Sequence, residues 1–104
     1  MFSSLEKITN LSCVPDYINA TDIYHTTTGG SSYTLPEDGY IRYQVTQGTI
    51  MISATINGKN DYRFGCSADT NYSTGGMVYM PKGSSVKRNA ETALEASLEF
   101  IPLK

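Results

Sequence analysis

The sequence is poor in the side chains on which catalysis and metal binding most often depend. Its 104 residues include no tryptophan, two cysteines and one histidine, His25. His25 lies next to a run of threonine, glycine and serine, where it would be solvated, and Cys13 and Cys66 lack the spacing of a zinc site. The glycine pairs lack the lysine of a phosphate-binding loop, and no two carboxylates form a recognisable catalytic pair. We therefore expect a protein without enzymatic activity, bound metal or cofactor.

Charged residues and long apolar runs are also scarce, which excludes further classes. Eight basic residues against ten acidic ones give a net charge of -2 and no basic stripe, so nucleic acid is not an expected partner. With 39% hydrophobic and only 17% charged residues, the chain should fold. No segment approaches the roughly 18 consecutive apolar residues of a membrane span, and residues 1–10 do not resemble a signal peptide. We expect neither membrane insertion nor secretion by that route.

The sequence is instead rich in tyrosine, glycine and small polar residues, a composition that suits strands, turns and recognition surfaces. Alternation of apolar and polar residues predicts strands at 40–45 and 49–56. Asn57 and Gly58 then predict a two-residue hairpin, with a return strand over 62–66. Short strands separated by turns at intervals of about ten residues are typical of a sandwich or barrel, so the predicted class is all-β.

The second half of the chain continues this pattern with one ambiguity. Residues 67–76 predict a long polar loop, residues 77–80 a strand and residues 81–83 a tight turn. Residues 90–100 allow either a helix capped by Asn89 or a strand. Strict alternation favours the strand. Whether Cys13 pairs with Cys66 stays open at this point.

The start of the chain differs from the rest. Ser3 followed by Glu6 fits a capping box, so one or two helical turns are expected there. Residues 26–32 contain two adjacent glycines and no large apolar side chain, which indicates a linker. We therefore predict an N-terminal attachment segment with its linker at 1–31 and a β-sandwich head domain at 32–104.

Two groups of residues are candidate interaction sites. Tyr40, Arg42 and Gln44 alternate on one face of a predicted strand, and this face is too aromatic for an ordinary solvated surface. It is the predicted subunit interface. The candidate ligand contacts combine tyrosines with planar polar groups, as sugar sites do, and are Asn60, Asp61, Tyr62, Arg63, Asp69, Asn71 and Tyr72.

Four segments occur in an order that is similar to a known family. They are Tyr-Thr-Leu-Pro-Glu-Asp-Gly-Tyr-Ile at 33–41, Ile-Asn-Gly-Lys at 56–59, Tyr-Met-Pro-Lys-Gly at 79–83 and Phe-Ile-Pro-Leu-Lys at 100–104. Together they resemble the small β-sandwich domains found at the tips of bacteriophage tail fibres and head fibres.

The resemblance implies an antiparallel, jelly-roll-like β-sandwich that forms a homotrimer. It also implies a structural protein of the virion, assembled in the host cytoplasm: a head fibre, a capsid decoration or a tail-fibre component. The N-terminal segment would bind other virion proteins, and the outer loops would contact a glycan or protein of the host surface. The alternative from the residues alone is a carbohydrate-binding module or adhesion domain.

Overall fold

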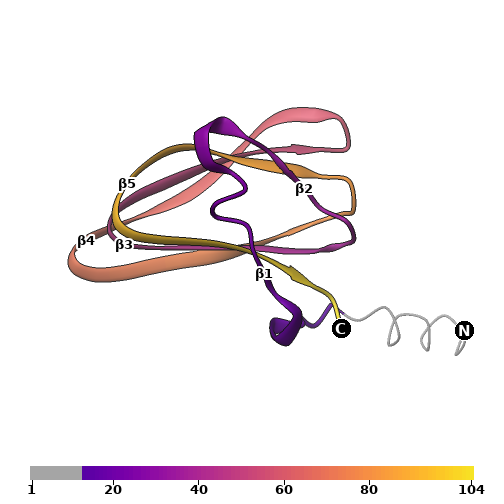
Figure 1. Ribbon diagram of the computed structural model, residues 1–104, viewed down its shortest axis with the longest axis horizontal. Helices are drawn as coiled ribbons and strands as arrows, with labels where there is room; N and C mark the ends of the chain where they lie inside the picture. The colour runs from indigo at the N-terminus through magenta and orange to yellow at the C-terminus, as the bar shows by residue number, and fades with distance from the viewer. Residues whose placement is uncertain (1–12) are drawn as a thin grey trace, which may run out of the picture.

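The computed structural model describes residues 13–104, most of which form one curled antiparallel β-sheet (Figure 1). Three long strands dominate it: β3 (Gly39–Ile56), β4 (Lys59–Met80) and β5 (Ser85–Pro102). β3 is central, β4 forms one edge, and β5 is flanked by the short strands β1 (Thr21–Asp22) and β2 (Tyr33–Thr34). This architecture agrees with the predicted all-β class.

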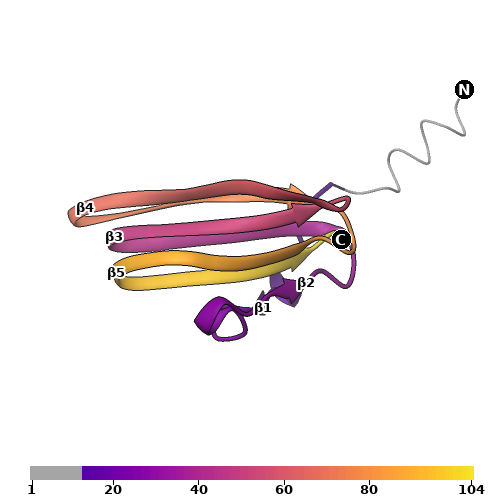
Figure 2. The same cartoon turned by 90° about the horizontal axis from the view of Figure 1, so that it is seen from above.

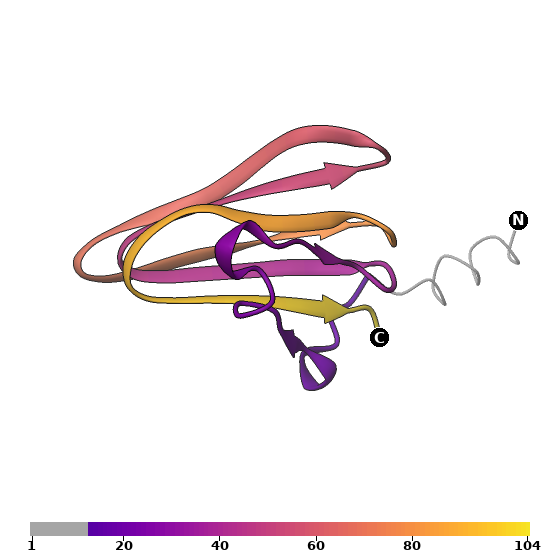
Figure 3. The ribbon, with the colours of Figure 1, turned by 45° about the horizontal axis from the view of Figure 1, so that its top comes forward.

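All three long strands bend at their middles, so that the sheet doubles back on itself (Figure 3). The first arm of the sheet contains the start of β3 and the ends of β4 and β5, and the second arm contains the remaining halves. In β3 the bend falls at Gln47 and Gly48, which both have positive φ values, 49° and 150°. In β4, residues 69–72 bulge out of register at the same place, and Asn71 among them has a positive φ value of 71°.

The bend also explains how one face of β3 stays buried along its whole length. Ile41 and Val45 are buried before the bend, whereas Ile50 and Ile52 are buried after it. The buried positions change from odd to even numbers across Gln47. Because side chains alternate along a strand, this irregularity keeps the apolar side chains of both arms facing the same core.

Several local predictions are confirmed. Asn57 and Gly58 form the β3–β4 turn with φ values of 52° and 77°, as a hairpin of this type requires. Residues 81–83 turn between β4 and β5, with Gly83 at a φ of 88°. Residues 90–100 are strand, as part of β5.

The predicted polar loop over residues 67–76 is wrong, because these residues belong to β4. Their polarity has a different cause. Ser67 and Ser73 point to the outward side of the sheet, where their hydroxyls hydrogen-bond those of Thr49 at 2.8 Å and Thr46 at 2.7 Å. An edge strand with small hydroxyl side chains on its solvent side has the same composition as a polar loop, so the sequence alone predicts a loop.

The described part of the predicted N-terminal segment packs along β5 (Figure 2). Pro15 bridges to Leu103, β1 pairs with the end of β5, and β2 pairs with its beginning. Ile23 is fully buried in the same core as the long strands. Residues 13–31 therefore pack on the same sheet and core as the long strands, and the helical turns expected near Ser3 lie outside the described residues.

We expect Ile23→Ala to lower the free energy of unfolding of the whole domain by about 2 to 5 kcal/mol, because it opens a cavity in the shared core. Chemical denaturation measures this loss. Ile18→Ala is the matched control, since Ile18 is 91% exposed in the same segment and its truncation should change stability by less than about 0.5 kcal/mol. Equal effects of the two substitutions would contradict the placement of Ile23.

Candidate interaction surface

The predicted interface residues lie together on the outward side of the first arm. Tyr40, Arg42 and Gln44 alternate along β3, and the register places Tyr79 opposite Tyr40 and Met77 opposite Arg42. The Tyr40 and Tyr79 rings meet edge to face, with 5.7 Å between their centroids. The alternation of β3 thus gathers aromatic and apolar side chains on one surface.

The N-terminal segment borders this surface. The Tyr40 hydroxyl donates a hydrogen bond to the Cys13 carbonyl oxygen at 2.8 Å, and the Tyr17 hydroxyl donates to the Met77 sulfur at 3.5 Å. Ile101 faces the same side as Tyr40, its partner in the register, yet it is fully buried. The segment therefore covers the β5 side of this surface and adds Tyr17, which is 54% exposed.

We call this surface the tyrosine face. It consists of aromatic, thioether and planar polar side chains: Tyr17, Tyr40, Arg42, Gln44, Met77 and Tyr79.

A shallow groove of about 510 Å³ crosses the tyrosine face between Arg42, Gln44 and Met77. It exists because β4 carries glycines here. A Cβ at Gly75 would come within 2.3 Å of the Tyr43 carbonyl oxygen, so a side chain at this position would displace the backbone. The groove is therefore fixed by the packing of β4 on β3.

The tyrosine face carries little net charge. Arg42 forms an ion pair with Glu99 at 3.8 Å. Loss of solvent around Tyr79, reinforced by nearby Asp38, Cys13 and Tyr40, raises the pKa of its phenol above the ordinary value. Tyr79 is 47% exposed and, like tyrosine in general, is neutral at physiological pH. Neutral, half-exposed aromatic side chains are typical of surfaces that become buried on association.

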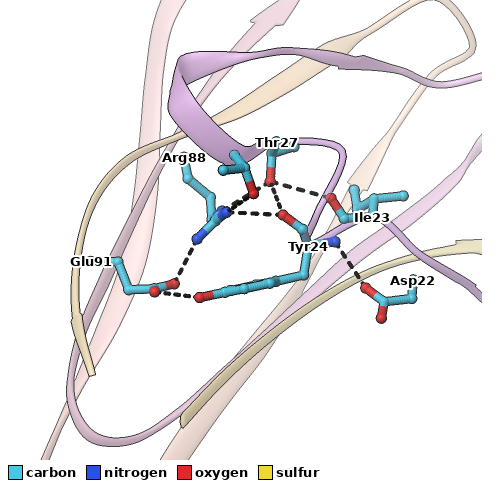
Figure 4. A network of polar contacts seen from close by, with 7 residues as sticks. Asp22, Ile23, Tyr24, Thr27, Arg88 and Glu91 are labelled. Carbon is cyan, nitrogen blue, oxygen red and sulfur yellow. Dashed lines mark hydrogen bonds and ion pairs between the residues drawn. The ribbon is translucent and has the colours of Figure 1, made fainter. Parts of the chain in front are cut away.

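A second polar cluster ties the N-terminal segment to the second arm (Figure 4). The Arg88 guanidinium donates to the Glu91 carboxylate at 3.0 Å, to the Tyr24 carbonyl oxygen at 3.0 Å and to the hydroxyls of Thr27 and Thr28 at 3.0 and 2.8 Å. It also stacks on the Tyr24 ring at 3.8 Å, and the Tyr24 hydroxyl donates to Glu91. Burial, followed by the contact with Glu91, raises the pKa of the Tyr24 phenol.

The Arg88 cluster is an anchor. Every polar group in it is directed at another member of the cluster or at the backbone of residues 23–28. His25, the single histidine of the sequence, is exposed beside it and meets the Tyr24 ring edge to face. The arrangement fixes the position of the N-terminal segment on β5.

The predicted ligand contacts are divided by the structure into two separate groups. Residues 60–63 follow the hairpin turn at one end of the second arm of β4, and Tyr62 and Arg63 are exposed there. Asp69, Asn71 and Tyr72 are exposed at the bend, at the other end of the same arm. The structure therefore does not bring these residues together into one site.

The described residues contain no group of histidine, cysteine and acidic side chains that could hold a metal ion. No disulfide joins Cys13 and Cys66. Burial raises the pKa of the Cys66 thiol, so it is protonated at physiological pH. Between residues 13 and 104, no helix is long and apolar enough to cross a membrane.

Sequence reasoning missed three members of the tyrosine face: Tyr17, Met77 and Tyr79. Met77 and Tyr79 do alternate in the sequence, but their register with Arg42 and Tyr40 depends on the bulge at the bend of β4. No known family model matches the chain, and no curated protein was found to match it.

Proposed function

We propose that this chain is a non-enzymatic structural protein of a bacteriophage virion, a head fibre, capsid decoration or tail-fibre component, that assembles as a homotrimer through its tyrosine face. The observation that carries the proposal is the tyrosine face itself. Tyrosine, methionine and arginine are enriched at the centres of protein interfaces, whereas lysine and glutamate are depleted there. A domain of this size also gains stability from area buried between subunits.

The arrangement of the segments that resemble fibre domains supports the same proposal. Residues 33–41, 79–83 and 100–104 are distant in the sequence, but Tyr40 pairs with both Tyr79 and Ile101 in the sheet. The three segments thus meet at the paired residues 39–41, 78–80 and 100–102 of the first arm, while Tyr33 and Thr34 pair with the start of β5. Segments that meet in the folded structure in this way are the ones we expect to be similar between proteins of the same fold.

We further propose that the two arms are the two layers of a jelly-roll-like sandwich. Support comes from the core, where Ile41 and Leu98 of the first arm and Ile52 and Val86 of the second belong to one buried cluster. The N-terminal segment would bind other virion proteins, and the exposed bend of β4 would be directed toward the host surface. A carbohydrate-binding module is less well supported, because its candidate contacts lie at opposite ends of one arm.

The mass in solution tests the proposed assembly. Size exclusion with light scattering should give about three times the 11.4 kDa mass of one chain. Tyr79→Asp should reduce this to the mass of a single chain, because it places a charge among the aromatic side chains of the tyrosine face.

The matched control is Tyr72→Asp, which introduces the same charge at an exposed position on the bend of β4 and should leave the trimer intact. Circular dichroism on both variants checks that they are folded. A monomeric wild-type protein would contradict the proposed assembly, and a Tyr79→Asp trimer would contradict the assigned interface. Recovery of the chain by mass spectrometry from purified particles tests the virion role independently of assembly.

A further inference from the structure

The outward side of the second arm carries a polar depression of about 410 Å³. This volume lies within the range of sites for small ligands. Hydroxyls, one carboxamide and two cationic side chains line it, and none of the described residues in its lining is acidic. The residues that carry the argument are Ser53, Thr55, Arg63, Ser85, Lys87 and Asn89.

The sheet register sets two cationic side chains on either side of a small hydroxyl. Ser53 on the central strand pairs with Arg63 of β4 and with Lys87 of β5. Opposed residues in antiparallel strands have Cβ atoms about 5 Å apart, so the two long side chains rise on either side of Ser53. Lys87, which is exposed, can direct its ammonium group over the serine from the β5 side.

A β-bulge completes the floor of the depression. The pairing of β3 with β5 slips between Met51 and Ile52, which leaves Asn89 as the extra residue of β5. The bulge lets Arg88 point inward to its anchor while the Asn89 amide donates a hydrogen bond outward to the Ser53 hydroxyl. Bulges often redirect a side chain in this way at functional sites.

The chemistry of the lining selects an acceptor-rich ligand. The Ser53 hydroxyl oxygen accepts from Asn89, so its own hydrogen is available to a ligand oxygen. Lys87 and Arg63 are donors only, and the Asn89 amide has a second N–H. Ser85 and Thr55, which pair with each other at the end of the depression, add hydroxyls that can both donate and accept.

We propose that this depression binds a sugar that carries a sulfate, phosphate or carboxylate group. The oxyanion lies above Ser53 beside Lys87 and the Asn89 amide, and the sugar hydroxyls meet Ser85 at the end of the depression. The net charge of -2 gives the chain no general attraction for anions, so recognition comes from this local arrangement. The proposal does not depend on the trimer or on the virion role.

Titration of the full-length chain with glucose 6-sulfate, followed by the backbone amide signals of the lining residues in NMR spectra, tests the proposal. Glucose 6-sulfate should bind more tightly than either glucose or inorganic sulfate, because the site contacts both parts of the ligand. Glucose 6-phosphate and glucuronate should likewise bind more tightly than glucose.

Lys87→Ala should weaken the binding of glucose 6-sulfate by about tenfold or more, since it removes a hydrogen bond to a charged group. Lys87 is exposed, so the variant should fold normally. Lys82→Ala is the matched control: Lys82 is also exposed, does not line the depression, and its loss should leave the affinity unchanged.

Five results would overturn the proposal. Equal affinity for inorganic sulfate would show that the site holds an adventitious ion only. Equal affinity for glucose would show that the oxyanion is not recognised. An equal loss in Lys82→Ala, or no loss in Lys87→Ala, would show that the lysine beside Ser53 does not bind the ligand. Absence of binding by every sugar would refute it outright.

Discussion

Replacing Arg88 with alanine is expected to lower the free energy of unfolding by about 3 to 5 kcal/mol. The Arg88 side chain is only 12% exposed, and its guanidinium holds Glu91 and the Tyr24 carbonyl oxygen at the same time. Truncation leaves the Glu91 carboxylate partly buried without its counter-charge, and it removes the cation from the Tyr24 ring. Most of the loss is the cost of that uncompensated charge.

Urea denaturation measures the effect of Arg88→Ala, and Arg42→Ala is the control. Arg42 also pairs with a glutamate, but at 3.8 Å and with 43% of its side chain exposed, so its loss should cost less than about 1 kcal/mol. Both substitutions are measured in the Tyr79→Asp background, so that the proposed interface, to which Arg42 belongs, does not affect the comparison. Arg88→Lys should fall between wild type and alanine, because an ammonium keeps the charge but cannot reach all four partners. Similar losses in Arg88→Ala and Arg42→Ala would show that the buried cluster is not an anchor.

Gly48→Ala is expected to destabilise the protein by about 3 to 5 kcal/mol through two additive causes. The φ value of 150° at Gly48 is one that residues with a Cβ rarely adopt. A Cβ at this position would also come within 1.8 Å of the Thr92 carbonyl oxygen on β5. The bend of the central strand must shift before the side chain can be accommodated.

The control for the bend is Gly58→Ala in the β3–β4 turn. Gly58 has a φ value of 77°, but an added Cβ would meet no atom within 4 Å. Gly58→Ala should therefore lower the free energy of unfolding by about 1 kcal/mol, which is the cost of a positive φ value for a residue with a Cβ. Thermal and chemical unfolding of both variants separate the two causes, and a Gly48→Ala protein as stable as Gly58→Ala would show that the bend is not tightly packed.

The sequence predicts those parts of the fold that depend on neighbouring residues. Asn57 and Gly58 favour positive φ values, so the turn between β3 and β4 follows from two side chains. Strict alternation identified residues 90–100 as strand, although alanine and glutamate prefer helices. Alternation also placed Tyr40, Arg42 and Gln44 on one face, and the structure shows them there.

The bend could not be predicted in the same way. The sequence predicts separate strands at 40–45 and 49–56, because Gln47 and Gly48 interrupt the alternation. In the structure, pairing with β5 continues across this point, so the interruption curves one strand instead of ending it. Local patterns do not distinguish these two outcomes, because the difference lies in the partner strand.

The same limit applies to the N-terminal segment and to both proposed surfaces. Residues 26–32 have the composition of a linker, yet Thr27 is fully buried because Arg88, 61 residues away, bonds its hydroxyl. The row formed by Arg63, Ser53 and Lys87 depends on the register of three strands. Contacts between residues that are distant in the sequence produce no alternation or spacing pattern from which they could be predicted.

The central position of β3 has a consequence for the order in which the chain folds. β3 meets β4 through a two-residue turn, so this pair can form early as a local hairpin. Its other neighbour arrives from far along the chain, because Gly39 pairs with Pro102. Closing so long a loop costs more conformational entropy than closing a hairpin and slows folding. We therefore expect the addition of β5 to be the step that commits the chain to its native state, with the β5 side of β3 exposed to other chains until that step is complete.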